Sequence, residues 1–105
     1  MEEIKKMEEI NKNFKEAKEA LKVVKNVSLV FSVKDEASGL YLGPILHRNK
    51  AVALRWWTDI CTKENMIKSH PNDYNLYYLG KFDEEIGLMI PEKIERFATA
   101  REFTE

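Results

Sequence analysis

Apolar residues recur at alternating steps of three and four along the first 25 residues, and mostly charged residues stand between them. The stripe consists of Met7, Ile10, Phe14, Ala17, Leu21 and Val24. This spacing, with abundant Glu, Lys and Ala, predicts an amphipathic helix over residues 2–25. The stripe can pack on its own domain or form a coiled-coil seam between chains. We expect a homodimer, held through Met7, Ile10, Phe14, Leu21 and Val24.

A β-hairpin is predicted directly after this helix. Residues 27–33 alternate between a face with Val27, Leu29, Phe31 and Val33 and a face with Ser28, Val30 and Ser32. The polar residues 34–39 end in Gly39, which tolerates the positive φ of a turn. Residues 40–42 then give a short strand that Gly43 and Pro44 interrupt. Because proline donates no backbone hydrogen bond, this strand should lie at a sheet edge or end there.

A second helix is predicted over residues 50–62, with Asn49 as its N-cap. Its apolar face consists of Val52, Ala53, Trp56, Trp57, Ile60 and Cys61. Adjacent helical residues point about 100° apart, so one of Trp56 and Trp57 should be buried and the other lie near the boundary. A short helical turn should follow at residues 66–67 and stop before Pro71.

Residues 75–82 alternate over their whole length and predict a central strand. Leu76, Tyr78, Gly80 and Phe82 should share one face, and Tyr77, Leu79 and Lys81 the other. Both faces carry large apolar groups, which predicts packing on each side. A turn with Gly87 at a positive φ leads to a partner strand over residues 88–90. Pro91 then suits the first position of a third helix, whose common face would hold Ile94, Phe97, Ala98 and Arg101.

These elements predict an α+β fold in which a small antiparallel sheet of two hairpins packs with helices, in the order α-ββ-α-ββ-α. We expect a single domain over residues 1–105, with a helical extension at 1–26 and an αβ core at 27–105. The composition, 44% hydrophobic and 33% charged, suits an ordinary folded domain. No apolar run is long enough to span a membrane, and the single cysteine, Cys61, suits a reducing cytoplasm.

Catalytic and metal-binding patterns are not found. The chain has no phosphate-binding glycine loop, zinc-ligand spacing or nucleophile elbow. His47, His70 and Cys61 match no metal-binding spacing, and Cys61 lies on the apolar face of its helix. The Asp83–Glu85 run suits a solvated turn better than a catalytic carboxylate group. We therefore expect a non-enzymatic protein without a metal or cofactor.

Aromatic and basic side chains suggest a nucleic-acid surface. The formal net charge of -1 argues against binding through bulk charge but leaves a local basic patch open. Bases of single-stranded nucleic acid stack on exposed rings, with Lys or Arg along the backbone. Tyr77 and Lys81, expected on one strand face, would form a small platform. The competing interpretation is that the rings only fill the space between sheet and helices. The candidate contacts are Lys50, Arg55, Trp57, Lys63, Tyr77 and Lys81.

Several short segments, in the same order, resemble the small nonstructural protein of gokushoviruses, a branch of the Microviridae, phages with single-stranded DNA genomes. They are Phe31–Asp35, Tyr41 with Gly43-Pro44, Asn49–Arg55, His70–Tyr74 and Leu76–Asp83, with Gly87 and Pro91 in matching places. The resemblance covers residues 27–103 and leaves out the N-terminal helix.

The resemblance implies a role in the host cytoplasm in phage DNA replication, at the switch to single-strand synthesis and packaging. It supplies no catalytic residues. The expected partners are single-stranded DNA or phage and host replication proteins. The alternative is a protein-interaction module that acts on a host or phage protein through the N-terminal helix or a sheet edge.

Overall fold

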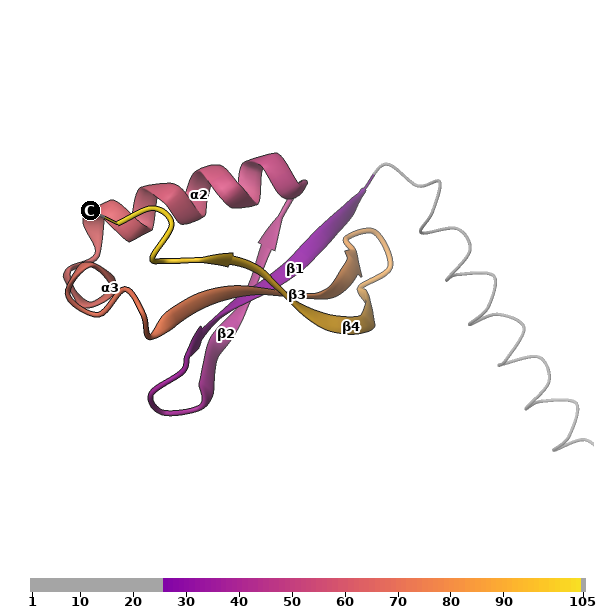
Figure 1. The fold of residues 1–105 in the computed structure, drawn as a ribbon. Helices are drawn as coiled ribbons and strands as arrows, with labels where there is room; N and C mark the ends of the chain where they lie inside the picture. Colours follow the sequence, from indigo (N-terminus) through magenta and orange to yellow (C-terminus); the bar gives the residue numbers. More distant parts are fainter. Residues whose placement is uncertain (1–25, 105) are drawn as a thin grey trace, which may run out of the picture.

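The computed structural model describes residues 26–104. The helix predicted over residues 2–25, and with it the expected dimer contacts, lies outside the described residues. The elements in chain order are β1 (Val27–Asp35), β2 (Leu40–His47), α2 (Lys50–Lys63), α3 (Asn65–Ser69), β3 (Tyr74–Asp83) and β4 (Leu88–Thr99). The strands form one twisted sheet in the order β2-β1-β3-β4, and all neighbours are antiparallel (Figure 1). The α+β class and both hairpins are therefore confirmed.

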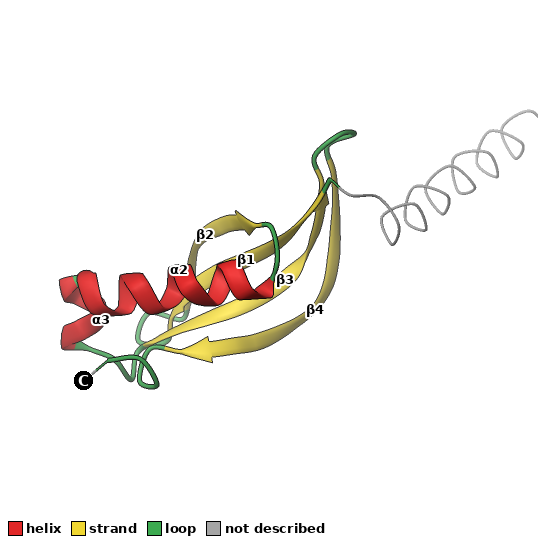
Figure 2. Cartoon of the chain, turned by 90° about the horizontal axis from the view of Figure 1, so that it is seen from above, coloured by secondary structure: helices red, strands yellow, loops and turns green. Residues whose placement is uncertain are grey.

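The hydrophobic core lies between one face of the sheet and α2, which crosses it (Figure 2). From the helices it takes Ala53, Trp57, Cys61 and Ile67, and from the strands Phe31, Val33, Tyr74, Leu76 and Ala98. Ala100 belongs to the same cluster, and Phe103 packs against it. Among the described elements, none covers the other face of the sheet (Figures 1 and 2). We expected packing on both sides of β3, and the described residues pack against one of them.

The first hairpin forms as predicted, with Gly39 at φ 76° in its turn. β2 is longer than expected, because Gly43 and Pro44 stay within the strand. Pro44 is tolerated there because β2 is an edge strand. The pairing of β1 with β2 is irregular between Ser32 and Lys34.

Both helix boundaries near α2 follow the predicted signals. The Asn49 side chain accepts a hydrogen bond from the Val52 amide at 2.9 Å, which confirms it as the N-cap. The short turn at residues 66–67 is α3, which ends at Ser69. His70 then leaves the helical region, with φ -133° and ψ 60°, because the following proline disfavours helical backbone.

β3 is the predicted central strand, but its alternation breaks at Gly80. Phe31 of β1 pairs with Tyr78, whereas the preceding Val30 pairs with Gly80, so Leu79 is an extra residue in a bulge. Beyond the bulge the two faces exchange. Lys81 therefore lies on the helix-covered face with Tyr78, and the expectation that it shares a face with Tyr77 is wrong.

The predicted third helix is also wrong, because residues 88–99 form β4. Pro91 pairs with Gly80 in β4, which is an edge strand. The sheet therefore tolerates the backbone amide that proline lacks. Between Pro91 and Glu95 the strand bulges relative to β3. Ile94 is consequently exposed instead of sharing a buried face with Ala98. The predicted turn before β4 is confirmed, with Gly87 at φ 68°.

Candidate nucleic-acid interface

The six candidate nucleic-acid contacts do not form one surface. Trp57 is 0% exposed, and its Nε1 donates a hydrogen bond to the Thr99 carbonyl at 3.1 Å. Its ring joins α2 to the end of β4 and is not available for stacking, so its proposed role as a contact is wrong. Trp56 is half-buried. This confirms that the two adjacent tryptophans divide between the core and its boundary.

Lys50 and Lys81 come together in one groove, although 30 residues separate them in the chain. Lys50 begins α2 and Lys81 lies beyond the bulge of β3. The groove has a volume of about 360 Å³, and Arg96 and the rings of Tyr78 and Phe97 also line it. We call it the α2–β4 groove; its remaining lining residues are Leu29, Glu92 and Glu95. Side chains from separate elements thus place positive charge beside aromatic rings.

Two carboxylates moderate this charge. Glu92 accepts a hydrogen bond from the Tyr78 hydroxyl at 2.5 Å and lies 3.8 Å from the Lys81 ammonium. Three cations against Glu92 and Glu95 leave the lining with a net charge of +1. Burial, and then the bond to Glu92, raise the pKa of Tyr78, so the phenol stays protonated. The groove therefore presents two or three cations to the phosphates of a nucleic acid and an apolar wall to one of its bases.

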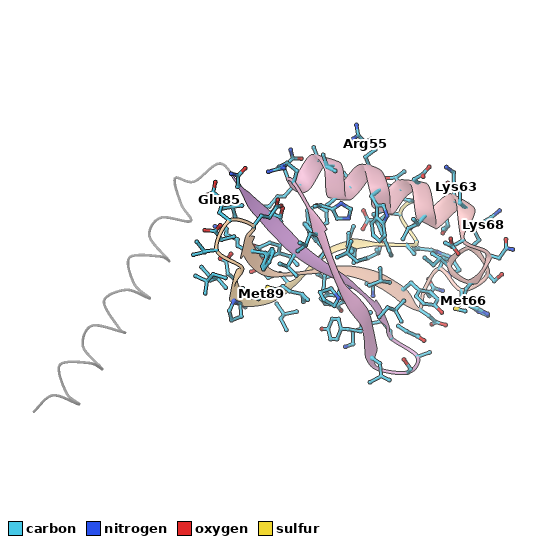
Figure 3. All side chains as sticks on the ribbon, turned by 180° about the vertical axis from the view of Figure 1, so that it is seen from behind. Arg55, Lys63, Met66, Lys68, Glu85 and Met89 are labelled. Carbon is cyan, nitrogen blue, oxygen red and sulfur yellow. The ribbon has the colours of Figure 1, made fainter. Side chains whose placement is uncertain are left out.

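Arg55 and Lys63 lie along the outer side of α2 (Figure 3). Lys63 forms an ion pair with Asp59 at 2.9 Å. Arg55 lines a separate open groove of about 860 Å³ with Trp56 and His47. These two candidate contacts are thus placed on the helix surface, away from Tyr77.

The His47 ring packs between two aromatic rings, at 5.9 Å from Phe31 and 5.0 Å from Trp56. Its Nε2 is buried and has no hydrogen-bond partner among the described residues. Burial lowers the pKa of His47, because the charged form would be desolvated. The imidazole is therefore neutral at pH 7 and acts as part of the packing.

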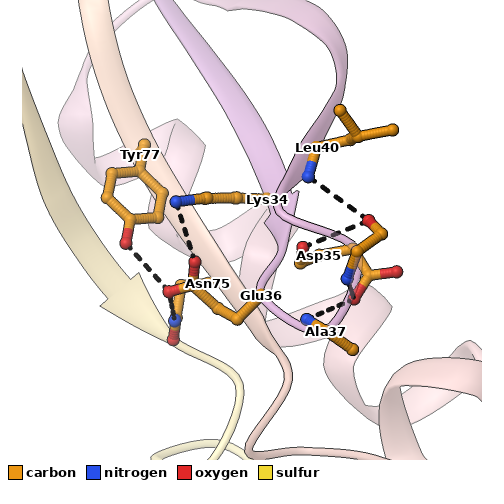
Figure 4. A network of polar contacts seen from close by, with 8 residues as sticks. Lys34, Asp35, Glu36, Ala37, Leu40, Asn75 and Tyr77 are labelled. Carbon is orange, nitrogen blue, oxygen red and sulfur yellow. Dashed lines mark hydrogen bonds and ion pairs between the residues drawn. The ribbon is translucent and has the colours of Figure 1, made fainter.

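Tyr77 lies on the opposite face of the sheet, in the polar network of Figure 4. Its ring meets Tyr41 edge to face at 5.6 Å, and the Lys34 ammonium is 5.5 Å and 5.8 Å from the two ring centres. Glu36 accepts hydrogen bonds from the Tyr77 hydroxyl at 3.0 Å and the Asn75 amide at 2.9 Å, and pairs with Lys34 at 3.2 Å.

This network is satisfied within itself. Burial would raise the pKa of Glu36, but its bonds from Lys34, Asn75 and Tyr77 together lower it. The bond and charge of Glu36 raise the pKa of Lys34 in return. The Lys34 charge is thus already matched, which makes this face a weaker site for a phosphate than the α2–β4 groove.

Two features of the groove could not be read from the sequence. Arg96 fell within the predicted third helix, and Tyr78 was predicted on the face of the strand opposite to Lys81. Recognition of residues 88–99 as a strand would have placed Arg96 in the sheet, but only the irregular pairing with β3 brings Arg96 opposite Tyr77 and Glu95 opposite Tyr78. The signal for that strand is weak, because Pro91 interrupts it.

Among the described residues, no three His, Cys, Asp or Glu side chains are placed so that they could hold a metal ion. Cys61 is buried, and burial raises the pKa of its thiol to about 11, so it is a core residue without thiolate character. Over residues 26–104, no helix is long and apolar enough to cross a membrane.

Fold and groove together define a small α+β domain with a basic and aromatic groove. Residues 28–103 match the family model described as Phage ORF5 protein. This match covers most of the chain, and the protein belongs to that family of phage proteins. Searches of curated proteins and of solved structures returned no match.

Proposed function

We propose that this phage protein is not an enzyme and supports replication of a single-stranded DNA genome by binding single-stranded DNA. Membership of the Phage ORF5 family supports the phage origin. The resemblance of residues 27–103 to the gokushovirus nonstructural protein supports the more specific role, at the switch to single-strand synthesis and packaging. That setting places the protein in the host cytoplasm.

The observation that carries the proposal is the α2–β4 groove. Lys50, Lys81 and Arg96 supply charges for phosphates, and Tyr78 and Phe97 supply ring surface for a base. A base paired inside a duplex cannot reach ring faces in such a groove, whereas an unpaired base can. The arrangement therefore favours single-stranded over duplex DNA, despite the net charge of -1.

The test is a fluorescence anisotropy titration of labelled single-stranded and duplex oligonucleotides over a range of salt concentrations. We expect micromolar binding to the single strand at low salt. Lys50→Ala with Lys81→Ala should weaken it and reduce the slope of log K against log salt by about 1.4, since each lost contact to single strands is worth about 0.7.

The matched control is Lys68→Ala with Arg101→Ala, which removes two exposed cations outside the groove. It should leave the slope close to that of the unchanged protein. Absence of binding by the unchanged protein, or an equal loss in both double variants, would contradict the proposal.

A second candidate function is a protein-interaction module. An apolar groove of about 430 Å³ lies between β2 and the two helices, with Ile45, Trp56 and Ile60 in its lining. Leu42 and Met66, also in its lining, are each 65% exposed. Exposed apolar grooves of this kind receive amphipathic partner segments.

The two functions separate in a pull-down from host lysate combined with the DNA titration. Met66→Lys should release a partner held in the apolar groove, whereas Leu54→Lys on α2, outside that groove, should not. Removal of residues 1–25 tests the N-terminal segment in the same way. A specific partner lost on either change, together with no DNA affinity, would favour this second function.

A further inference from the structure

The face of the sheet opposite α2 carries the polar network of Tyr77 at one end and an apolar area around Val30. β1 presents Ser28, Val30 and Ser32 there, each almost fully buried. Their neighbours across the ladders include Leu46 of β2 and Phe82 of β3. We call this surface the open face.

Its edges expose large apolar side chains. Leu46, the ladder partner of Val30, is 43% exposed, and Met89, the partner of Phe82, is 47% exposed. Val30 is buried without belonging to the core cluster under α2. Apolar side chains that protrude from a sheet face are stabilised when a second layer covers them. The described residues supply that layer on one face.

We propose that residues 7–24 of the same chain pack their apolar stripe against the open face, antiparallel to β1. The stripe, Met7 to Val24, provides apolar side chains that can cover the exposed Leu46 and Met89. As the predicted helix, these 18 residues span roughly 27 Å. The nine residues of β1 span roughly 30 Å. The lengths of stripe and strand therefore match.

The short connection to β1 favours packing of residues 7–24 from the same chain over packing of these residues from a second copy. Only Lys25 and Asn26 separate Val24 from β1. The Glu84 amide donates to the Asn26 carbonyl at 3.0 Å, and the Asn26 side chain bonds to Glu85. The chain thus enters β1 from a fixed point, and a two-residue connection is a normal length for a helix that folds back on a strand.

This arrangement predicts specific neighbours. Ala17 lies about 10 Å along a helix from Val24, and Val30 lies about 10 Å along β1 from Val27. Ala17 should therefore approach Val30 and its exposed ladder partner Leu46.

The test is disulfide cross-linking in the full chain, which carries Ala17→Cys and Leu46→Cys. The native Cys61 can stay, because it is buried and its pKa is raised to about 11. The matched control pairs Ala17→Cys with Leu54→Cys. Leu54 is 39% exposed, close to the 43% of Leu46, but lies on α2 across the sheet.

We expect a disulfide within one chain for the Ala17–Leu46 pair, at least tenfold faster than for the control pair. Light scattering should give the mass of one chain. Disulfides between two chains, with a mass of two, would overturn the proposal in favour of the homodimer. Equal rates for the two pairs, or no disulfide in either, would show that the stripe does not cover this face.

Discussion

Gly80 is the position where a single methyl group should have the largest effect on stability. It holds φ 154°, and a Cβ placed there would overlap the Ile90 carbonyl oxygen and lie 3.0 Å from the Pro91 Cα. Both atoms belong to the backbone of β4, so no side-chain rotation relieves the overlap. Gly80→Ala must therefore displace β4 or change the bulge.

The magnitude follows from two contributions. A non-glycine residue in this backbone region costs about 1–3 kcal/mol. Displacement of β4 weakens one or two ladder hydrogen bonds, at about 1 kcal/mol each. The free energy of unfolding should fall by about 3 kcal/mol. For a domain of this size that corresponds to a decrease in Tm of about 12–24 °C.

Urea unfolding followed by the fluorescence of Trp56 and Trp57 measures this loss. The m value should stay unchanged, because the surface exposed on unfolding is the same. Gly87→Ala is the control: Gly87 has φ 68°, and a Cβ there has nothing within 4 Å. It should cost only the backbone term of about 1–2 kcal/mol. If Gly80→Ala costs no more than Gly87→Ala, the close approach of β4 is not a constraint.

Three further predictions concern single side chains. Because the folded state keeps His47 neutral and the unfolded state does not, stability should fall as the pH drops below about 6.5. Thermal unfolding at several pH values should show this decrease in stability for the unchanged protein and for His70→Phe, and a smaller decrease for His47→Phe. Equal pH dependence of stability in the two variants would refute the prediction. Asn49→Ala should lose about 1 kcal/mol in urea unfolding and Asn49→Asp much less, because a carboxylate also caps the helix; equal losses would exclude a capping role. Trp57→Phe should lose about 1–3 kcal/mol, because it leaves a small void and removes the hydrogen bond to Thr99; an unchanged urea midpoint would contradict the burial of this ring.

Local signals predicted the elements that depend on them. Asn49 marks the start of α2 because a cap acts within one turn, and Pro71 limits α3 because proline constrains its immediate neighbour. Gly39 and Gly87 have the positive φ values expected of their turns. These features need no knowledge of what packs against them.

Features that depend on a neighbouring strand could not be predicted. Pro91 favours both a helix start and an edge strand, and only its pairing with Gly80 decides between them. The bulge at Leu79 and Gly80 is likewise invisible in a run that alternates without interruption. Because that bulge exchanges the faces of β3, the predicted Tyr77–Lys81 platform was wrong. For the same reason, the sequence could not predict that Lys81 and Lys50 line one groove.

The outer strand β2 has a consequence for the behaviour of the protein in concentrated solution. Its eight residues, Leu40–His47, carry no acid, lysine or arginine, which are the groups that commonly keep sheet edges apart. Pro44 and the irregular pairing near Ser32 are the features that interrupt this edge. The protein therefore resists edge-to-edge association through β2 by backbone geometry instead of charge. This resistance should be insensitive to ionic strength.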